Sequence, residues 1–187
     1  MAAQEIQSST DVKNWYSTIV KGKENFVKVR SAGKSALGKN IPVLDIYSGT
    51  KKNKEIIILL TRQHPPEVTG YYAFQSFLST VLSDNELSNS FLSKYRILAF
   101  PILNPDGVDL GHWRHNAGGV DLNRDWSVYN QPEIRQITKF IERNRKEKII
   151  LGLDFHSTWH DVFYTNKTRE GTALPSFIND WFVSLEK

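Results

Sequence analysis

Cysteine is absent from the 187-residue sequence. This absence excludes disulfide bonds, cysteine nucleophiles and thiolate metal sites, so nitrogen and oxygen atoms must supply the ligands of any bound metal. Long apolar runs are absent as well. The longest spans residues 56–60, far short of the ~20 residues that a helix needs to cross a bilayer, and we therefore expect no membrane span.

A large excess of one charge is also missing, because the formal net charge is only +4. Two basic clusters, at residues 51–54 and 143–146, are short and lie beside apolar runs instead of forming a continuous stripe. We interpret both as solvated surface and expect no nucleic-acid partner. The first residues lack the basic and long apolar segments of a signal peptide, but Met1 is compatible with an initiator placed before a mature terminus. We favour a secreted or periplasmic location over a cytoplasmic one.

Strand and helix patterns alternate along most of the chain. The run at residues 55–61 has the pattern of a buried strand, and apolar residues at helical spacing follow it at 67–82. This alternation predicts an α/β sheet with covered faces, and the length predicts a single domain over residues 1–187. The further expected elements are helices at 10–20, 132–144 and 174–185 and strands at 26–30, 41–47, 95–103, 149–155 and 161–165.

The stretch at residues 104–126 is unusually long for a connection without secondary structure. Loops of this length are usually functional or disordered, and this one places polar residues among glycines, as a binding surface would. We therefore expect a functional loop. Its polar residues include Asn104, Asp106, Arg114, Asp121, Asn123 and Arg124.

His64 and Glu67 directly follow the expected strand at 55–61, and His156 follows the strand at 149–155. In an open α/β sheet, ligands bind at the carboxyl ends of strands, so these positions can converge. Each signal alone has a structural alternative, a capping carboxylate beside a surface histidine or a hydrogen-bonded histidine. Together, two imidazoles and a carboxylate match the three-ligand set of a catalytic zinc.

Four segments occur in an informative order along the chain: Arg62-Gln-His64-Pro-Pro-Glu67, Asn104-Pro-Asp-Gly107, Arg114 with Asp121-Leu-Asn123-Arg124, and Asp154-Phe-His156-Ser157. In this order they resemble the motifs of M14 zinc carboxypeptidases, over about residues 33–164. The nine-residue step from Arg114 to Asn123 is more similar to the cytosolic-carboxypeptidase and related bacterial branches than to the digestive branch. The resemblance implies a mixed, mostly parallel sheet with helices on both faces.

The resemblance also implies roles for individual residues. One Zn²⁺ per chain would be held by His64, Glu67 and His156, and Asp121 would orient a ligand imidazole. Arg114 would polarise the scissile carbonyl of the substrate. The implied function is removal of C-terminal residues from peptides or proteins by metal-activated water. The residues implied to hold the substrate's free carboxylate are Asn123 and Arg124.

The sequence departs from the family pattern after His156. Peptide hydrolysis of this kind needs a general base, which the family supplies from a glutamate far downstream. Neither Glu170 nor Glu186 lies in a matching context, and the family's late tyrosine is unmatched. We therefore expect a C-terminally incomplete domain with little or no turnover by itself, an expectation that zinc-dependent release of C-terminal residues by this chain would contradict.

Two other functions fit part of the pattern. The related N-acyl amino acid amidohydrolases, or deacylases, share a zinc site and an Asn-Arg carboxylate clamp, and the choice between peptides and N-acyl amino acids separates them. A non-catalytic module that binds peptide C-termini through Asn123 and Arg124 is the third interpretation. Binding without cleavage, also by a longer gene product, would favour it.

Overall fold

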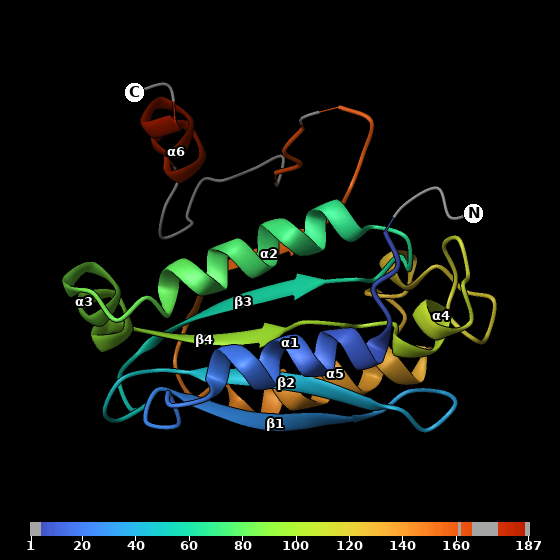
Figure 1. The fold of residues 1–187 in the computed structure, drawn as a ribbon, viewed down its shortest axis with the longest axis horizontal. Helices are drawn as coiled ribbons and strands as arrows, with labels where there is room; N and C mark the ends of the chain where they lie inside the picture. Colours follow the sequence, from blue (N-terminus) through green and yellow to red (C-terminus); the bar gives the residue numbers. More distant parts are fainter. Residues whose placement is uncertain (1–4, 161, 166–175, 186–187) are drawn as a thin grey trace. The chain divides into compact units, whose positions relative to one another are not determined.

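The computed structural model describes residues 5–160, 162–165 and 176–185 (Figure 1). The chain divides into two compact units, residues 1–157 and residues 158–187. The prediction of a single domain over residues 1–187 stays a prediction. Among the described residues, no helix combines the length and the apolar character that crossing a membrane requires.

A five-stranded sheet with the order β1-β2-β4-β3-β5 forms the centre of the first unit. The pairs β3–β4 and β3–β5 are parallel, whereas β2 is antiparallel to both of its neighbours. Four of the five strands therefore point the same way, and the predicted mixed, mostly parallel sheet is confirmed. The strands span Val27–Lys34 (β1), Asn40–Ile46 (β2), Glu55–Thr61 (β3), Tyr95–Phe100 (β4) and Ile149–Phe155 (β5).

Helices cover both faces of this sheet, as predicted, because alternate strand residues bury their side chains in two separate apolar cores. On one face, α1 (Ser9–Val20) and α2 (Val68–Val81) pack over the sheet through residues such as Val12 and Phe74. On the other face, α5 (Pro132–Asn144) buries Ile137 and Phe140 against the strands (Figure 1). The central strands are thereby enclosed between two helical layers.

The structure departs from the sequence-based expectation between residues 86 and 103, and β1 extends to Lys34, beyond the strand expected at 26–30. A helix that was not predicted, α3 (Glu86–Lys94), begins at a capping box formed by Asn85 and Ser88 and packs Leu92 into the core. The strand expected at 95–103 ends at Phe100. Pro101, which has no N–H to donate to a sheet ladder, follows directly.

The expected loop at 104–126 contains two short helical segments. Asn104 caps α4 (Pro105–Asp109) by accepting a hydrogen bond from the backbone N–H of Gly107, and Pro105 occupies the first turn. A 3-10 turn at Leu122–Arg124 begins after Asp121, whose side chain accepts from Asn123 N. Side-chain caps therefore fix the conformation at both ends of this polar segment.

The second unit contains α6 (Phe177–Leu185), in place of the expected helix at 174–185. Residues 174 and 175 lie outside the described residues. The ring centroid of Trp181 lies 5.4 Å from that of Phe163 and 5.6 Å from that of Phe177. The strand expected at 161–165 does not form at residues 162–165, and residue 161 lies outside the described residues.

Candidate metal centre

His64 lies on a short loop between β3 and α2. The chain leaves β3 through Arg62, whose φ of 57° is in the left-handed region and turns the backbone. The buried guanidinium of Arg62 then holds the loop, because its Nη2 donates to the carbonyl of Pro65 at 2.9 Å. Glu67 closes the loop as the residue that precedes α2. A turn with its own buried anchor thus positions both side chains.

His156 reaches the same place from the other parallel strand. β3 and β5 pair in register from Ile57 to Thr61, and Thr61 faces Phe155 at their carboxyl ends. Because His156 follows Phe155 directly, the strand pairing brings it beside the loop that carries His64. Residues 92 positions apart in the chain therefore share one end of the sheet, as the sequence analysis expected.

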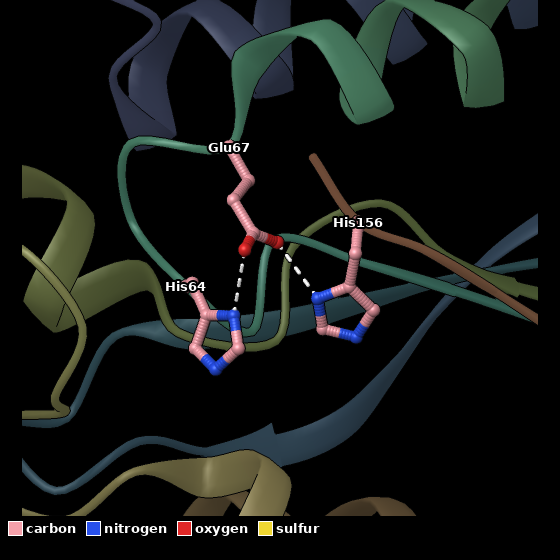
Figure 2. Close-up of side chains that lie close together, drawn as sticks. All are labelled: His64, Glu67 and His156. Carbon is pink, nitrogen blue, oxygen red and sulfur yellow. Dashed lines mark hydrogen bonds and ion pairs between the residues drawn. The ribbon is translucent and has the colours of Figure 1, made fainter. Parts of the chain in front are cut away.

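The two imidazoles flank the carboxylate of Glu67 (Figure 2). His64 Nδ1 lies 2.8 Å from Glu67 Oε1, and His156 Nδ1 lies 2.7 Å from Glu67 Oε2. One ligand atom from each residue lies within 4.8 Å of those of the other two. The structure therefore brings together all three of the predicted metal ligands.

Each imidazole is held from behind by a second carboxylate. His64 Nε2 lies 2.9 Å from Asp121 Oδ1, and His156 Nε2 lies 2.8 Å from Asp154 Oδ2. Both Nε2 atoms are thus engaged, and both Nδ1 atoms face the shared Glu67. Carboxylates in this position fix the orientation of a metal-binding imidazole and make it a stronger ligand.

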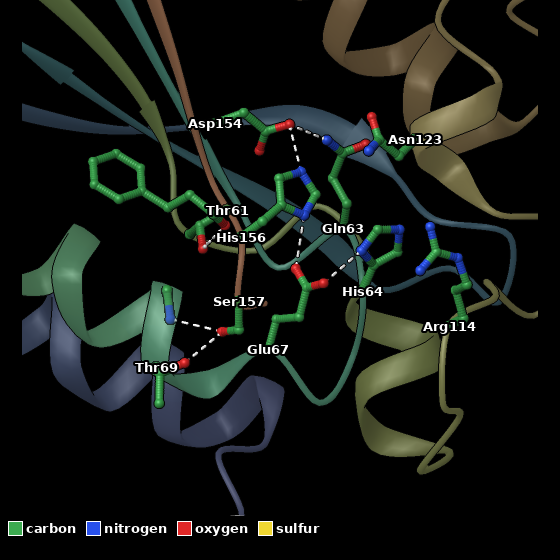
Figure 3. A network of polar contacts seen from close by, with 12 residues as sticks. Thr61, Gln63, His64, Glu67, Thr69, Arg114, Asn123, Asp154, His156 and Ser157 are labelled. Carbon is green, nitrogen blue, oxygen red and sulfur yellow. Dashed lines mark hydrogen bonds and ion pairs between the residues drawn. The ribbon is translucent and has the colours of Figure 1, made fainter. Parts of the chain in front are cut away.

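Asp154 and Gln63 belong to this network but were given no role in the sequence analysis (Figure 3). The amide Nε2 of Gln63 donates to Asp154 Oδ2, and its Oε1 accepts from the indole N–H of Trp126 at 2.9 Å. One signal could have identified Asp154. It precedes His156 by two residues on a strand, and residues at this spacing point to the same face.

Mutual hydrogen bonding shifts the pKa values of these groups. Burial raises the pKa of Glu67, but hydrogen bonds from His156 and His64 outweigh it and bring the pKa down to about 2. Burial raises the pKa of Asp121 too, and hydrogen bonds from His64 and Arg114 lower it to about 2. Burial lowers the pKa of His156, whereas Asp154 and Glu67 raise it to about 10. Both carboxylates are therefore ionised at neutral pH, as a cation site requires.

The predicted substrate-binding residues lie on the loop beside His64. Arg114 Nε donates to Asp121 Oδ2 at 2.7 Å, so one carboxylate positions both His64 and Arg114. The backbone N–H of Asn123 donates to the other oxygen of Asp121 at 2.9 Å. The next residue, Arg124, is exposed, and its Nη1 donates to the Asn123 carbonyl at 3.3 Å. Asp121 thus connects one candidate ligand, His64, to Arg114 and to the backbone of Asn123.

A close contact fixes α2 against the end of β5. Gly70, in the first turn of α2, lies so near His156 that a Cβ there would be 2.4 Å from the His156 carbonyl oxygen. Ser157 Oγ accepts a hydrogen bond from Gly70 N at 2.9 Å and lies 2.6 Å from Thr69 Oγ1. Since Glu67 makes no side-chain cap, Ser157 satisfies one of the free N–H groups at the start of this helix.

The other histidines of the loop do not join the centre. The ring of His112 lies 3.2 Å from the backbone carbonyls of His115 and Asn116, and the side chain of His115 is exposed. Trp113 and Trp159 are exposed over 71% and 93% of their surface. Both histidines therefore lie outside the candidate metal centre, and neither tryptophan is a buried packing residue.

The donor set at the centre fits zinc. Two imidazoles and one carboxylate are ligands that Zn²⁺ binds in catalytic sites, where a fourth position stays open, and a protonated imidazole such as that of His156 gives up its proton when it binds the ion. The contacts to Asp121 and Asp154 supply the support from behind that such ligands need. His64, Glu67 and His156 are thus the residues that would hold the ion.

Comparison with known proteins places this arrangement in a family. The profile of the zinc carboxypeptidase family matches residues 12–175. Cytosolic carboxypeptidase 2 of Xenopus tropicalis is 31% identical over 161 residues, which cover 80% of this chain and 17% of that protein. The chain therefore spans less than a fifth of the length of this relative.

Two solved structures share the fold. A metallo-carboxypeptidase from Burkholderia cenocepacia matches with a TM-score of 0.73 and 19% identity, over 83% of this chain and 42% of that chain. The carboxypeptidase A from Helicoverpa armigera matches with a TM-score of 0.73 and 22% identity, over 97% of this chain and 53% of that chain. With a family profile that covers most of its length, this chain belongs to the zinc carboxypeptidase family.

Proposed function

We propose that this chain carries the zinc-binding and carboxylate-binding residues of a metallocarboxypeptidase that removes C-terminal residues from peptides or proteins. The observation that carries the proposal is the convergence of His64, Glu67 and His156, within 4.8 Å of one another, at the carboxyl ends of two parallel strands. Family membership supports the same reaction class.

The three ligands would hold one Zn²⁺ through His64 Nδ1, His156 Nδ1 and the Glu67 carboxylate. When bound, zinc supplies Lewis acidity, which polarises a substrate carbonyl and activates water for attack. The protein's own part is to keep both imidazoles oriented, and Asp121 and Asp154 do so from the Nε2 side.

The loop that carries Asp121 would hold the substrate. Arg114 is fixed through Nε, which leaves its two terminal nitrogens to donate to the oxygen that gains charge when a peptide carbonyl is attacked. Arg124 is exposed, and its planar guanidinium suits two-pronged binding of a free C-terminal carboxylate, with the Asn123 amide beside it.

Turnover also requires a group that takes a proton from the attacking water and returns it to the leaving amine. Among the described residues, Glu67 is the only glutamate that contacts His64 or His156, and both of its oxygens face these imidazoles. Glu170 and Glu186 lie outside the described residues. That the isolated chain has little or no turnover stays part of the proposal.

Metal content tests the proposal most directly. The purified chain is loaded with zinc, desalted and measured by elemental analysis, beside a His64→Ala variant and a matched His115→Ala control. We expect about one zinc per chain in the unmodified protein and in the control, and a strong loss in His64→Ala, because one of three protein ligands is gone. If the unmodified chain takes up no zinc, the proposal is wrong.

A further inference from the structure

A cavity lies at the opposite end of the sheet from His64, where β3, β4 and β5 begin. It has a volume of about 150 Å³, and its lining includes Ile56 at the start of β3 and Asn144 at the end of α5. We call it the basic pocket, after the basic side chains that line it: Lys51, Lys52, Lys54, Arg96, Arg143 and Lys146.

The basic pocket joins the two clusters that look unrelated in the sequence. Residues 51–54 precede β3, and residues 143–146 precede β5, so parallel pairing of these strands brings the clusters together. Two hydrogen bonds hold them: Ile56 N donates to the Lys148 carbonyl at 2.8 Å, and Asn53 N donates to the side-chain Oε1 of Glu147 at 3.0 Å. The fold thus sets where the backbones of the two clusters lie, whatever conformations their side chains adopt.

Arg96, which lines the basic pocket, belongs to an ion-pair group with more cations than anions. Arg96 is 4% exposed and donates from Nε and Nη2 to both oxygens of Asp45, at 2.7 and 2.8 Å. Arg30 Nη1 donates to the same carboxylate at 2.9 Å. Arg96 Nη1 also donates to the Asn144 carbonyl at 2.9 Å, which fixes the guanidinium in place. One buried carboxylate is therefore shared by two guanidinium groups.

The rim adds further positive charge. Lys51, Lys52, Arg143 and Lys146 are exposed, and within the described part of the chain their side chains make no hydrogen bond or ion pair. Glu147 is the only acidic residue in the lining, and its carboxylate already accepts from a backbone N–H. Cations that share a concave surface with low-dielectric walls repel one another and focus a positive potential into the cavity.

We propose that the basic pocket binds a small, multiply charged oxyanion of the phosphate class. The cavity volume of about 150 Å³ suits a small oxyanion such as phosphate or pyrophosphate. Lys51, Lys52, Lys146 and Arg143 supply mobile ammonium and guanidinium donors, whereas the buried ammonium of Lys54 donates to the backbone carbonyls of Leu92 and Ser93. Mobile donors beside the fixed guanidinium of Arg96 favour oxyanions with several acceptor oxygens. The ligand relieves the repulsion among the rim cations, since it supplies the negative charge that the lining lacks.

The proposal is tested with inorganic pyrophosphate on metal-free protein, so that no zinc can capture the probe. Backbone amide resonances are followed by NMR during a titration, beside a sodium chloride titration of equal ionic strength. We expect saturable shifts at residues 51–54 and 143–147 that chloride does not reproduce. Shifts confined to the surroundings of Arg114 and Arg124, or equal shifts with chloride, would overturn the proposal.

Charge-matched variants sharpen this test. Lys52→Gln with Lys146→Gln removes two rim cations, and Lys13→Gln with Lys21→Gln removes two exposed lysines of the α1 region. We expect the pyrophosphate dissociation constant to rise about tenfold or more in the first variant, because charge-assisted hydrogen bonds are lost, and to stay within about twofold in the second. Equal weakening in both would mean that only the net charge matters, and the pocket would not be a site.

Discussion

The two strand ends that form the metal centre differ in how firmly the sheet holds them. The end of β3 belongs to a strand with a paired neighbour on each side, and the side chain of His64 is only 4% exposed. Among the described residues, β5 pairs on one side only, and the side chain of His156 is 26% exposed. One half of the centre is therefore built into the sheet, and the other half follows the edge strand of the sheet that the described residues form.

This difference shows which contacts hold each of the two histidines in position. The loop of His64 is anchored by its own strand and by the buried Arg62. His156 has less support from the sheet and depends on its contacts with α2 and with Asp154. Changes at those contacts should therefore affect zinc binding more than changes elsewhere on β5.

The largest effect is expected from Gly70→Ala. Replacing glycine by alanine within a helix normally stabilises it by about 1 kcal/mol. Here the new Cβ would lie 2.4 Å from the His156 carbonyl oxygen, so β5 or the start of α2 must shift. Because α2 follows Glu67 directly, either shift separates two ligands. We expect loss of stoichiometric zinc in elemental analysis and a cost of about 1–3 kcal/mol in the free energy of unfolding.

Gly152→Ala is the matched control for this change. Gly152 lies in β5 itself, and a Cβ there meets no atom within 4 Å. We expect the variant to keep its zinc and to unfold at the same or a slightly higher denaturant concentration, as removal of a strand glycine predicts. If Gly70→Ala also kept its zinc, the contact with α2 would not position His156.

An intermediate effect is expected from replacing the supporting carboxylates. Asp121→Asn and Asp154→Asn each weaken the acceptor behind one imidazole, and losses of this kind raise the metal dissociation constant by about 10–100-fold. Asp121 is the more buried of the two and serves His64, Arg114 and the Asn123 backbone together. We therefore expect Asp121→Asn to raise the zinc dissociation constant more than Asp154→Asn, as measured by competition with a zinc chelator.

Asp109→Asn provides a control of equal charge and size for both carboxylates. Asp109 contacts Ser9 and Lys39 and has no contact with the metal centre among the interactions of the described residues. The zinc dissociation constant of the Asp109→Asn variant should match that of the unmodified chain. A stronger effect of Asp154→Asn than of Asp121→Asn would reverse the comparison and make the β5 end the more organised half.

Much of the fold could be predicted because strong patterns coincide with deeply buried elements. The run at 55–61 forms β3 with unchanged bounds, as does the pattern at 132–144, which forms α5. The sequence of α3 gave no comparable signal. Its residues, ELSNSFLSK, are mostly polar, and only Leu92 is a buried apolar side chain. The helix depends on its capping box and on tertiary packing, which periodicity does not reveal.

The candidate site shows the same division. The ligands could be predicted because each follows a recognisable strand, and strand ends converge in this class of sheet. The contact of Gln63 with Asp154 depends on the register between β3 and β5, which no local pattern states. The basic pocket was missed for the same reason, since residues 51–54 and 143–146 meet only when those two strands pair.

The smallest effect is expected from Ser157→Ala, which removes the acceptor that the segment after β5 offers to the first turn of α2. Loss of a helix cap costs about 1 kcal/mol in the free energy of unfolding. Ser8→Ala removes a cap of the same chemistry from α1, far along the chain from the ligands, so a similar cost is expected there. Because only Ser157 is adjacent to His156, zinc affinity should fall a few-fold in Ser157→Ala and stay unchanged in Ser8→Ala. Equal zinc affinity in the two variants would mean that Gly70 and Asp154 position His156 without help from the cap.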